Sequence, residues 1–267
     1  MVPKNMMASK DDALHATPAM CYHCFDTLID SLQNQTQHNK ASNRMPTSKV
    51  PSFAKDLKDV SIECPLFVTW DKQAMSSSSP PKYQLRGCIG TLSPRLLVPS
   101  VGEYALISAL NDRRFRSIRL DEVSQLRVSV SLLVRYEPCQ HLEDWSIGTH
   151  GLLIKFRVQG QDYSATYLPE VAKEQGWTKE YTLTTLIQKA GYHQKITPEV
   201  LSKLVMTRYQ SSKCRATFAD YFQHHKSQQQ QRPNDDEGRA AMARDLLLSS
   251  LSSSAKKSQS WTPCNNL

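Results

Sequence analysis

The sequence predicts an α+β fold built on a mixed, mainly antiparallel sheet with flanking helices. Strand-like and helix-like segments follow one another irregularly, which argues against a parallel sheet made of repeated βαβ units. The clearest strand covers residues 126–135, where Leu126, Val128 and Val130 alternate with polar residues, so that one face is buried. Apolar residues make up only 39% of the 267 positions, which indicates that part of the chain lies outside a packed core.

Capping residues and prolines predict most of the helices. Thr17 and Pro18 are typical of a helix start, and apolar residues then recur every three or four positions as far as Leu32. The same reasoning predicts further helices over residues 101–111, 169–176 and 182–190, and another that begins at residues 197–199. The remaining predicted strands cover residues 66–70, 83–89, 152–158 and 162–168, with a late strand around residues 207–209.

Composition divides the chain into one folded domain and two polar ends. Residues 223–267 contain a Gln tract and Ser-rich stretches, which bury too little apolar surface to offset the chain entropy lost on folding. We therefore expect a domain over residues 17–222, a disordered N-terminus over 1–16 and a disordered tail over 223–267. Low-complexity inserts are expected near residues 33–50 and 72–82.

Several classes of protein are disfavoured by the sequence. It has no signal-peptide core and no run of about 18 apolar residues, so we expect a protein that is neither secreted nor membrane-spanning. Its seven scattered cysteines fit free thiols in the nucleus or cytoplasm. Cys21 and Cys24 form a single CxxC pair without a second one, so no metal site is predicted. The net charge of +8 suggests tolerance of anionic partners.

Residues 85–91 (Leu-Arg-Gly-Cys-Ile-Gly-Thr) form the first candidate site. On a strand, Arg86 and Cys88 share a face about 6.6–7 Å apart, close enough for the guanidinium to favour a thiolate. Gly87 and Gly90 lack side chains, so a ligand or another backbone can approach closely. The segment is therefore either a pocket floor with an activated cysteine, or a tightly packed edge strand with an inert one.

Four arginines within residues 113–119 form the second candidate site. Arg114, with Asp112 beside it, could hold a small carboxylate or phosphate. Nucleic-acid backbone is another possible partner, although no ladder of aromatic residues for base stacking accompanies the arginines. The structural alternative is a solvated helix end at which Asp112 pairs locally.

His150 lies between two glycines, in Gly148-Thr149-His150-Gly151, and is the third candidate. It could move a proton at the mouth of a pocket, or simply occupy a turn. The sequence contains no phosphate-binding loop, dinucleotide fingerprint, nucleophile elbow or zinc-protease motif. The cofactor stays unknown, and whether the protein is an enzyme stays open.

The segment Leu85-Arg86-Gly87-Cys88-Ile89-Gly90 resembles the signature of the AMMECR domain family, which is named after a human chromosomal-deletion syndrome. The resemblance runs in order through residues 22–26, 64–70, 108–115, 129–133, 148–151, 165–177, 207–209 and 218–221. It implies a mixed α/β domain whose two subdomains surround a central sheet and form a cleft. The resemblance supplies no reaction, and it associates animal members with the nucleus.

Three functional hypotheses follow. In the first, the cleft binds a small anionic ligand or substrate: Arg86, Gly87, Gly90, Asp112 and Arg114 would bind it, while Cys88 and His150 would be catalytic. In the second, the domain is a non-enzymatic interaction or regulatory module in which the glycines pack and the arginines dock a protein partner. In the third, ranked last, the arginines of residues 113–119 bind nucleic acid weakly. No membrane partner is expected.

Overall fold

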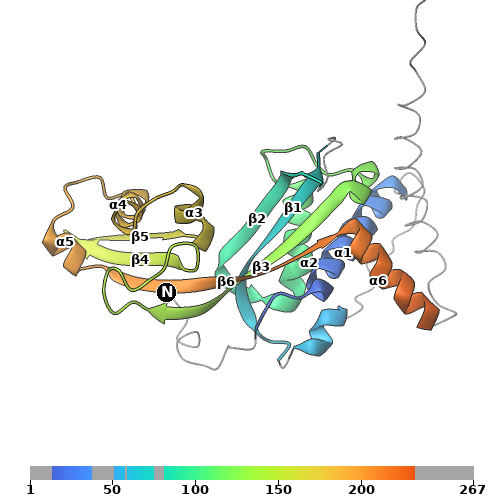
Figure 1. Cartoon of the computed structure of the whole chain (residues 1–267), viewed down its shortest axis with the longest axis horizontal. Helices are drawn as coiled ribbons and strands as arrows, with labels where there is room; N and C mark the ends of the chain where they lie inside the picture. Colours follow the sequence, from blue (N-terminus) through green and yellow to red (C-terminus); the bar gives the residue numbers. More distant parts are fainter. Residues whose placement is uncertain (1–13, 38–50, 58, 75–80, 232–267) are drawn as a thin grey trace, which may run out of the picture. The chain divides into compact units, whose positions relative to one another are not determined.

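The computed structural model describes residues 14–37, 51–57, 59–74 and 81–231. It confirms the predicted α+β class, with six strands in one sheet of order β2-β1-β3-β6-β4-β5 (Figure 1). The pairs β1–β2, β4–β5 and β4–β6 are antiparallel. The elements are, in order, α1 (Pro18–Gln37), η3 (Ser52–Asp56), β1 (Glu63–Gln73), β2 (Tyr83–Leu96), α2 (Leu97–Leu110), η4 (Leu120–Gln125), β3 (Leu126–Pro138), β4 (Gly151–Val158), β5 (Gln161–Tyr167), α3 (Pro169–Glu174), α4 (Lys179–Lys189), α5 (Pro198–Ser202), β6 (Val205–Thr217) and α6 (Phe218–Gln231).

The described chain forms two compact units. The β1–β2 unit comprises residues 17–130 and 214–231 as far as they are described, and the β4–β5 unit comprises residues 14–16 and 131–213. Strands β3 and β6 contribute residues to both units. The cleft expected between two subdomains stays a prediction.

Helices α1 and α2 supply much of the core of the β1–β2 unit, where α2 packs on β1 and β2 (Figure 1). Phe25 and Leu28 of α1 are fully buried, and the Phe25 ring meets Trp70 of β1 edge-on, with 5.2 Å between centroids. The Trp70 indole Nε1 donates a hydrogen bond to the Ala105 carbonyl oxygen of α2 at 2.9 Å. This buried bond fixes α2 on the sheet, since an unpaired indole N–H would be costly there.

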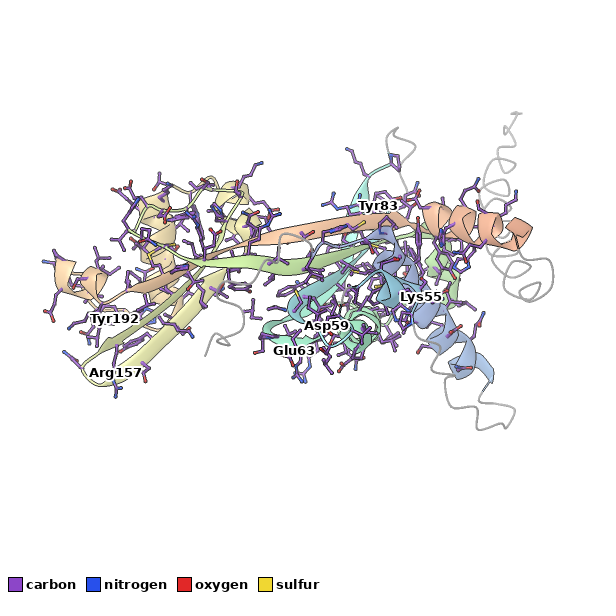
Figure 2. All side chains as sticks on the ribbon, turned by 90° about the horizontal axis from the view of Figure 1, so that it is seen from below. Lys55, Asp59, Glu63, Tyr83, Arg157 and Tyr192 are labelled. Atoms are coloured by element: carbon purple, nitrogen blue, oxygen red, sulfur yellow. The ribbon has the colours of Figure 1, made fainter. Side chains whose placement is uncertain are left out.

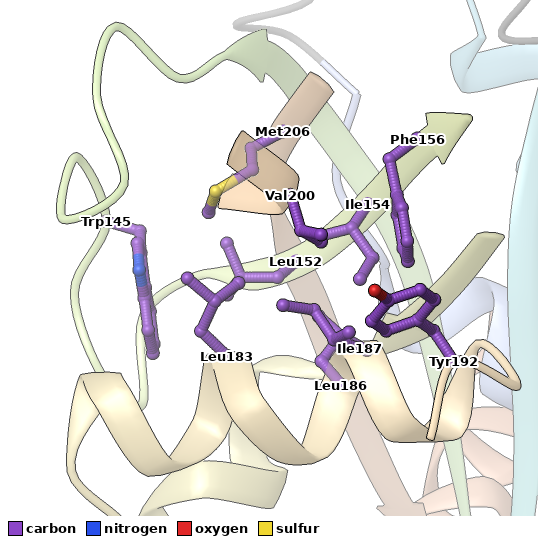
Figure 3. Packing of buried hydrophobic residues seen from close by; sticks show 10 residues of the cluster. All are labelled: Trp145, Leu152, Ile154, Phe156, Leu183, Leu186, Ile187, Tyr192, Val200 and Met206. Atoms are coloured by element: carbon purple, nitrogen blue, oxygen red, sulfur yellow. The ribbon is translucent and has the colours of Figure 1, made fainter. Parts of the chain in front are cut away.

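The β4–β5 unit has its own hydrophobic core, shown in Figure 3. Leu152, Ile154 and Phe156 of β4 alternate along the strand, and all three are buried against a cluster that includes Leu186 and Ile187 of α4. Helix α5 begins as the sequence predicts, because the Thr197 side chain accepts a hydrogen bond from a backbone N–H of the first turn. Helix α4 begins at Lys179, three residues before the predicted start at residue 182, because Thr178 caps it in the same way. At the β4–β5 hairpin, Arg157 lies one residue before the end of β4 (Figure 2).

Helices α1 and α6 extend into segments that the sequence predicts to be polar linker or tail. Helix α1 reaches Gln37, past the expected insert boundary at 33, and α6 reaches Gln231, past the expected domain boundary at 222. In α6 the Gln228 side chain forms a hydrogen bond with the His224 ring, with 2.9 Å between Nε2 atoms. The His224 ring stacks on that of Tyr22 of α1, with 4.4 Å between ring centroids. These contacts explain why Gln-rich sequence is helical here. Residues 1–13, 38–50, 75–80 and 232–267, also predicted as disordered or low-complexity, lie outside the described residues.

Candidate functional site

Strand β2 carries the first candidate residues and pairs with β1. Thr69 lies opposite Cys88, and Trp70 lies opposite Gly87. The Cys88 thiol is partly buried, and its Sγ lies 3.1 Å from the Thr69 hydroxyl oxygen. Because directly opposed residues share a face of the sheet, Cys88 and Thr69 form a cross-strand pair.

The two glycines of the motif are positions of close packing within the protein. A Cβ atom at Gly87 would lie 2.1 Å from the Ser108 carbonyl oxygen of α2. A Cβ atom at Gly90 would lie 2.3 Å from the Leu66 carbonyl oxygen and 2.4 Å from the Phe67 ring. The absent side chains therefore admit neighbouring backbone and an aromatic ring. Ligand binding by Gly87 and Gly90 stays a prediction.

The end of α2 supplies polar groups to the backbone of β2. The Ser108 hydroxyl accepts a hydrogen bond from the Ile89 N–H at 3.0 Å and donates one to the Val68 carbonyl oxygen at 2.8 Å. One turn later, Oδ2 of Asp112 accepts a hydrogen bond from the Cys88 N–H at 2.9 Å. Strand β2 is at the edge of the sheet, and the Asp112 carboxylate satisfies the backbone N–H of Cys88 on this strand. The Ser108 hydroxyl instead links β2 to β1, because Val68 belongs to β1 and lies opposite Ile89.

Asp112 and Arg114 form an ion pair beside Cys88. Asp112 is 5% exposed, and its carboxylate accepts hydrogen bonds from Arg114 Nε at 3.0 Å and Nη2 at 2.7 Å. The Arg114 hydrogen bonds lower the pKa of Asp112 well below its usual value, against the opposing effect of burial. Arg114 Nη2 also donates to the Cys88 carbonyl oxygen at 3.1 Å. Asp112 thus pairs with an arginine two residues away, which is the local pairing that the sequence analysis gives as the structural alternative.

Arg86 of β2 forms hydrogen bonds with the backbone of the loop of residues 111–119. Its guanidinium donates to Glu122 Oε2 at 3.0 Å, to the Arg116 carbonyl oxygen at 2.5 Å and to the Ser117 carbonyl oxygen at 3.3 Å. The Arg86 and Glu122 side chains are only 14% and 15% exposed. Burial opposes the ionisation of Glu122, but hydrogen bonds from Arg86 and Lys72 outweigh it and lower the pKa of Glu122 to about 2.

The arginine loop, as we call residues 111–119, carries its remaining cations on the surface. The side chains of Arg113 and Arg116 are exposed, and neither makes an ion pair within the described part of the chain. Arg119 pairs with Asp121 at 2.7 Å. Arg114 is 57% exposed although it is bonded to Asp112. The loop therefore presents positive charge outward while its backbone is fixed from within.

His150 belongs to the β4–β5 unit, whereas the other candidates belong to the β1–β2 unit. Its ring Nδ1 accepts a hydrogen bond from the Ser146 N–H at 2.9 Å, within a turn closed by the His150 N–H and the Ser146 carbonyl oxygen. Because Nδ1 is an acceptor, the neutral ring carries its proton on Nε2. Burial lowers the pKa of His150, and the charge of Arg208 adds to the effect. In this conformation the ring offers an Nε2–H donor rather than a free base.

The structure therefore brings Cys88, Asp112 and Arg114 into direct contact, with Arg86 bonded to the same loop at Arg116 and Ser117, and it places His150 in a different unit. These contacts, with Glu122, are called the network below. Joint catalysis by Cys88 and His150 stays a prediction. Sequence reasoning missed Glu122, the acceptor for Arg86. The acidic pair Asp121-Glu122 directly after the arginine run was the available signal, because buried arginines usually have a carboxylate partner.

The described residues contain neither a metal-binding cluster nor a membrane-spanning helix. No group of three or more His, Cys, Asp or Glu side chains is arranged to hold a metal ion there, and no helix there is long and apolar enough to cross a membrane. The network consists instead of ion pairs, cross-strand contacts and backbone hydrogen bonds.

Comparison with known proteins identifies the family. A family model described as AMMECR1 matches residues 21–214, which include both strands and the loop of the network. The chain belongs to the AMMECR1 family. It is 37% identical over 214 residues to an uncharacterised protein of Arabidopsis thaliana, covering 79% of this chain and 90% of that one. It is 35% identical over 204 residues to an uncharacterised protein of Schizosaccharomyces pombe, covering 76% of this chain and 94% of that one.

One solved structure is also similar to this chain. The crystal structure of an uncharacterised protein from Pyrococcus horikoshii aligns with a TM-score of 0.49 and 22% sequence identity, covering 73% of this chain and 89% of that one. The names of these three proteins state no activity.

Proposed function

We propose that this AMMECR1-family domain is an interaction module whose arginine loop docks onto an acidic segment of a partner protein. The observation that carries the proposal is the set of hydrogen bonds by which partly buried Arg86 fixes the loop backbone at Arg116 and Ser117. A loop fixed in this way loses little conformational entropy on binding, so more of the electrostatic attraction appears as affinity. Exposed Arg113 and Arg116 supply that attraction.

The internal pairing of the network favours docking over capture of a small anion. Arg86 and Arg114 are the two cations predicted to hold an anion, and each already bonds a carboxylate. A small anion would have to displace Glu122 or Asp112, which leaves a buried carboxylate without its partner. An extended acidic segment requires no such displacement, because it reaches exposed arginines at several points along its length.

Fluorescence anisotropy with a fluorescein-labelled decaglutamate peptide tests the proposal. We expect Arg113→Ala/Arg116→Ala to weaken binding at least tenfold at 25 mM NaCl. The matched control Lys195→Ala/Lys213→Ala removes the same charge from exposed lysines of the β4–β5 unit and should change the affinity less than threefold. Equal losses in the two double variants would refute a dedicated surface, since net charge alone would then explain binding.

The variant Glu122→Gln distinguishes binding that depends on a fixed loop from binding that depends on charge attraction alone. It removes a negative charge near the arginine loop, so charge counting predicts tighter binding of decaglutamate. The proposal predicts weaker binding, because Arg86 loses its ionised acceptor and holds the loop less firmly. Tighter binding by this variant would exclude the role given to Arg86.

The small-anion function, with Cys88 as a nucleophile, remains the second candidate. The contact between Arg114 and the Cys88 carbonyl oxygen favours it, because a half-exposed guanidinium then lies beside a partly exposed thiol. Inorganic phosphate that displaced decaglutamate at millimolar concentration and raised the melting temperature would support this candidate. Tight binding of a labelled ten-nucleotide DNA strand, with a steep dependence on salt, would support the nucleic-acid hypothesis.

A further inference from the structure

Two cysteines far apart in sequence meet where helix α1 packs near strand β6. Cys21 lies in the first turns of α1, and Cys214 lies near the end of β6. The Cys21 thiol donates a hydrogen bond to the Cys214 carbonyl oxygen, with 3.6 Å between Sγ and O. Both residues belong to the β1–β2 unit, so this contact lies within one compact body.

The two thiols differ in their exposure. Cys21 is 0% exposed, whereas Cys214 is partly exposed and its Sγ lies 3.9 Å from the Arg215 carbonyl oxygen. A small oxidant dissolved in water therefore reaches Cys214 first, and Cys21 is positioned behind it. This order of access is typical of a reactive cysteine with a neighbouring resolving cysteine.

We propose that Cys21 and Cys214 are a peroxide-sensitive pair that forms a disulfide between α1 and β6. In the first step the Cys214 thiol loses its proton and the thiolate attacks hydrogen peroxide. The O–O bond breaks, a sulfenic acid forms, and the leaving hydroxide takes up the released proton to become water. The Cys21 sulfur then attacks the sulfenic sulfur of Cys214. The S–S bond forms, and the hydroxyl group leaves as a second water with the Cys21 proton. Two electrons pass from the two thiols to the peroxide.

The electrostatics of the unmodified pair are consistent with this order. The hydrogen bond with Cys214 is the largest cause that raises the pKa of Cys21, followed by burial, so Cys21 stays a thiol in the reduced protein. Cys21 is therefore protected from direct oxidation by its burial and its high pKa, and the partly exposed Cys214 reacts first.

Cys24 could compete with Cys214 for a disulfide with Cys21, but its thiol is bonded to helix α2 instead. It lies three residues further along α1, and its thiol donates to the Val101 carbonyl oxygen of α2 at 3.8 Å. Burial raises the pKa of Cys24 to well above its usual value. A bond between Cys21 and Cys24 would require the Cys24 side chain to leave this contact.

Mass spectrometry of the full chain after treatment with 1 mM hydrogen peroxide tests the proposal. Digestion without reductant is expected to yield a linked peptide joining Cys21 to Cys214 as the main disulfide product. The link should be absent from Cys214→Ser and should persist in Cys24→Ser. Cys139→Ser is the matched control, because Cys139 is also partly exposed but belongs to the β4–β5 unit; the link should persist there at the wild-type yield.

A trapping experiment keeps the test decisive if a variant folds poorly. In Cys21→Ser, dimedone is expected to label Cys214 at least fivefold more than in the wild type, because the resolving thiol is missing and the sulfenic acid accumulates. A main link from Cys214 to any other cysteine, or a main Cys21–Cys24 link, would overturn the proposal. Oxidation of Cys214 to sulfinic acid without any link in the wild type would also overturn it.

Discussion

Replacing Gly87 with alanine is the sharpest test of the packing that underlies the network. The new Cβ atom would lie 2.1 Å from the Ser108 carbonyl oxygen, which is over 1 Å closer than ordinary contact allows. The obstacle is helix backbone, so β2 and α2 must move apart. Overpacking of this kind costs about 1–3 kcal/mol, and we expect the upper half of that range because no side chain can rotate away.

Hydrogen exchange measured by mass spectrometry reads out each unit separately. For Gly87→Ala we expect amide protection across β1 and α2 to fall roughly 30- to 150-fold, which corresponds to about 2–3 kcal/mol. Protection in β4 should stay within twofold. Gly102→Ala is the matched control, because its Cβ would meet the end of the His23 side chain at 2.9 Å, and alanine favours the helix by about 1 kcal/mol.

Two results would refute this reasoning. One is a Gly87→Ala protein whose protection in β1 and α2 stays within threefold of wild type. The other is restoration of protection in Gly87→Ala by the additional change Ser108→Ala, because the clash involves the Ser108 main chain, which that change leaves in place.

Three further predictions follow from the ionised and capping groups. The pKa of Glu122 falls to about 2 on folding from a usual 4.5, so its ionised form stabilises the folded protein fully above pH 4.5, and this stabilisation is lost as the pH falls toward 2. Glu122→Gln should therefore flatten this part of a plot of melting temperature against pH, and parallel curves for the variant and the wild type would contradict the prediction. Long-range 1H–15N NMR should show the Nε2–H tautomer of His150 with a pKa below 6.5, and an Nδ1–H tautomer would contradict the Ser146 hydrogen bond. Thr197→Ala should destabilise α5 by about 1 kcal/mol in hydrogen exchange, with Thr197→Ser restoring most of the loss.

Local signals in the sequence predict the starts of helices and the centres of strands. Pro18 and Pro198 begin helices as expected, because a proline in the first turn acts through neighbouring residues alone. Thr197 caps α5, whereas the buried Thr17 hydroxyl has no hydrogen-bond partner among the described residues, so α1 begins without the predicted side-chain cap. The far half of β2 was not predictable in this way. Residues 90–96 include Pro94 and exposed leucines, a composition that does not indicate a strand. They are extended because they pair with β1, and the last pair of this ladder joins Leu96 to Glu63.

The candidate site was predictable as a set of residues but not as a set of contacts. The motif around Arg86 and the run around Arg114 do lie together, as expected from their glycine and arginine content. Which carboxylate each arginine meets depends on tertiary packing: Arg86 bonds Glu122, 36 positions away, while Arg114 bonds Asp112, two positions away. Sequence spacing indicates the second pairing and is silent on the first.

The passage of β3 and β6 through both units has a genetic consequence. Residues 131–213 are inserted between the two sequence segments that make up the β1–β2 unit. A premature stop codon within the insertion would therefore also delete the end of β6 and α6, including Phe218, whose ring packs at 5.8 Å from that of Phe25. Nonsense and frameshift alleles in the middle of the gene should thus abolish both halves of the protein, whereas an in-frame excision of residues 131–213 with a short linker is the deletion that could leave one half folded.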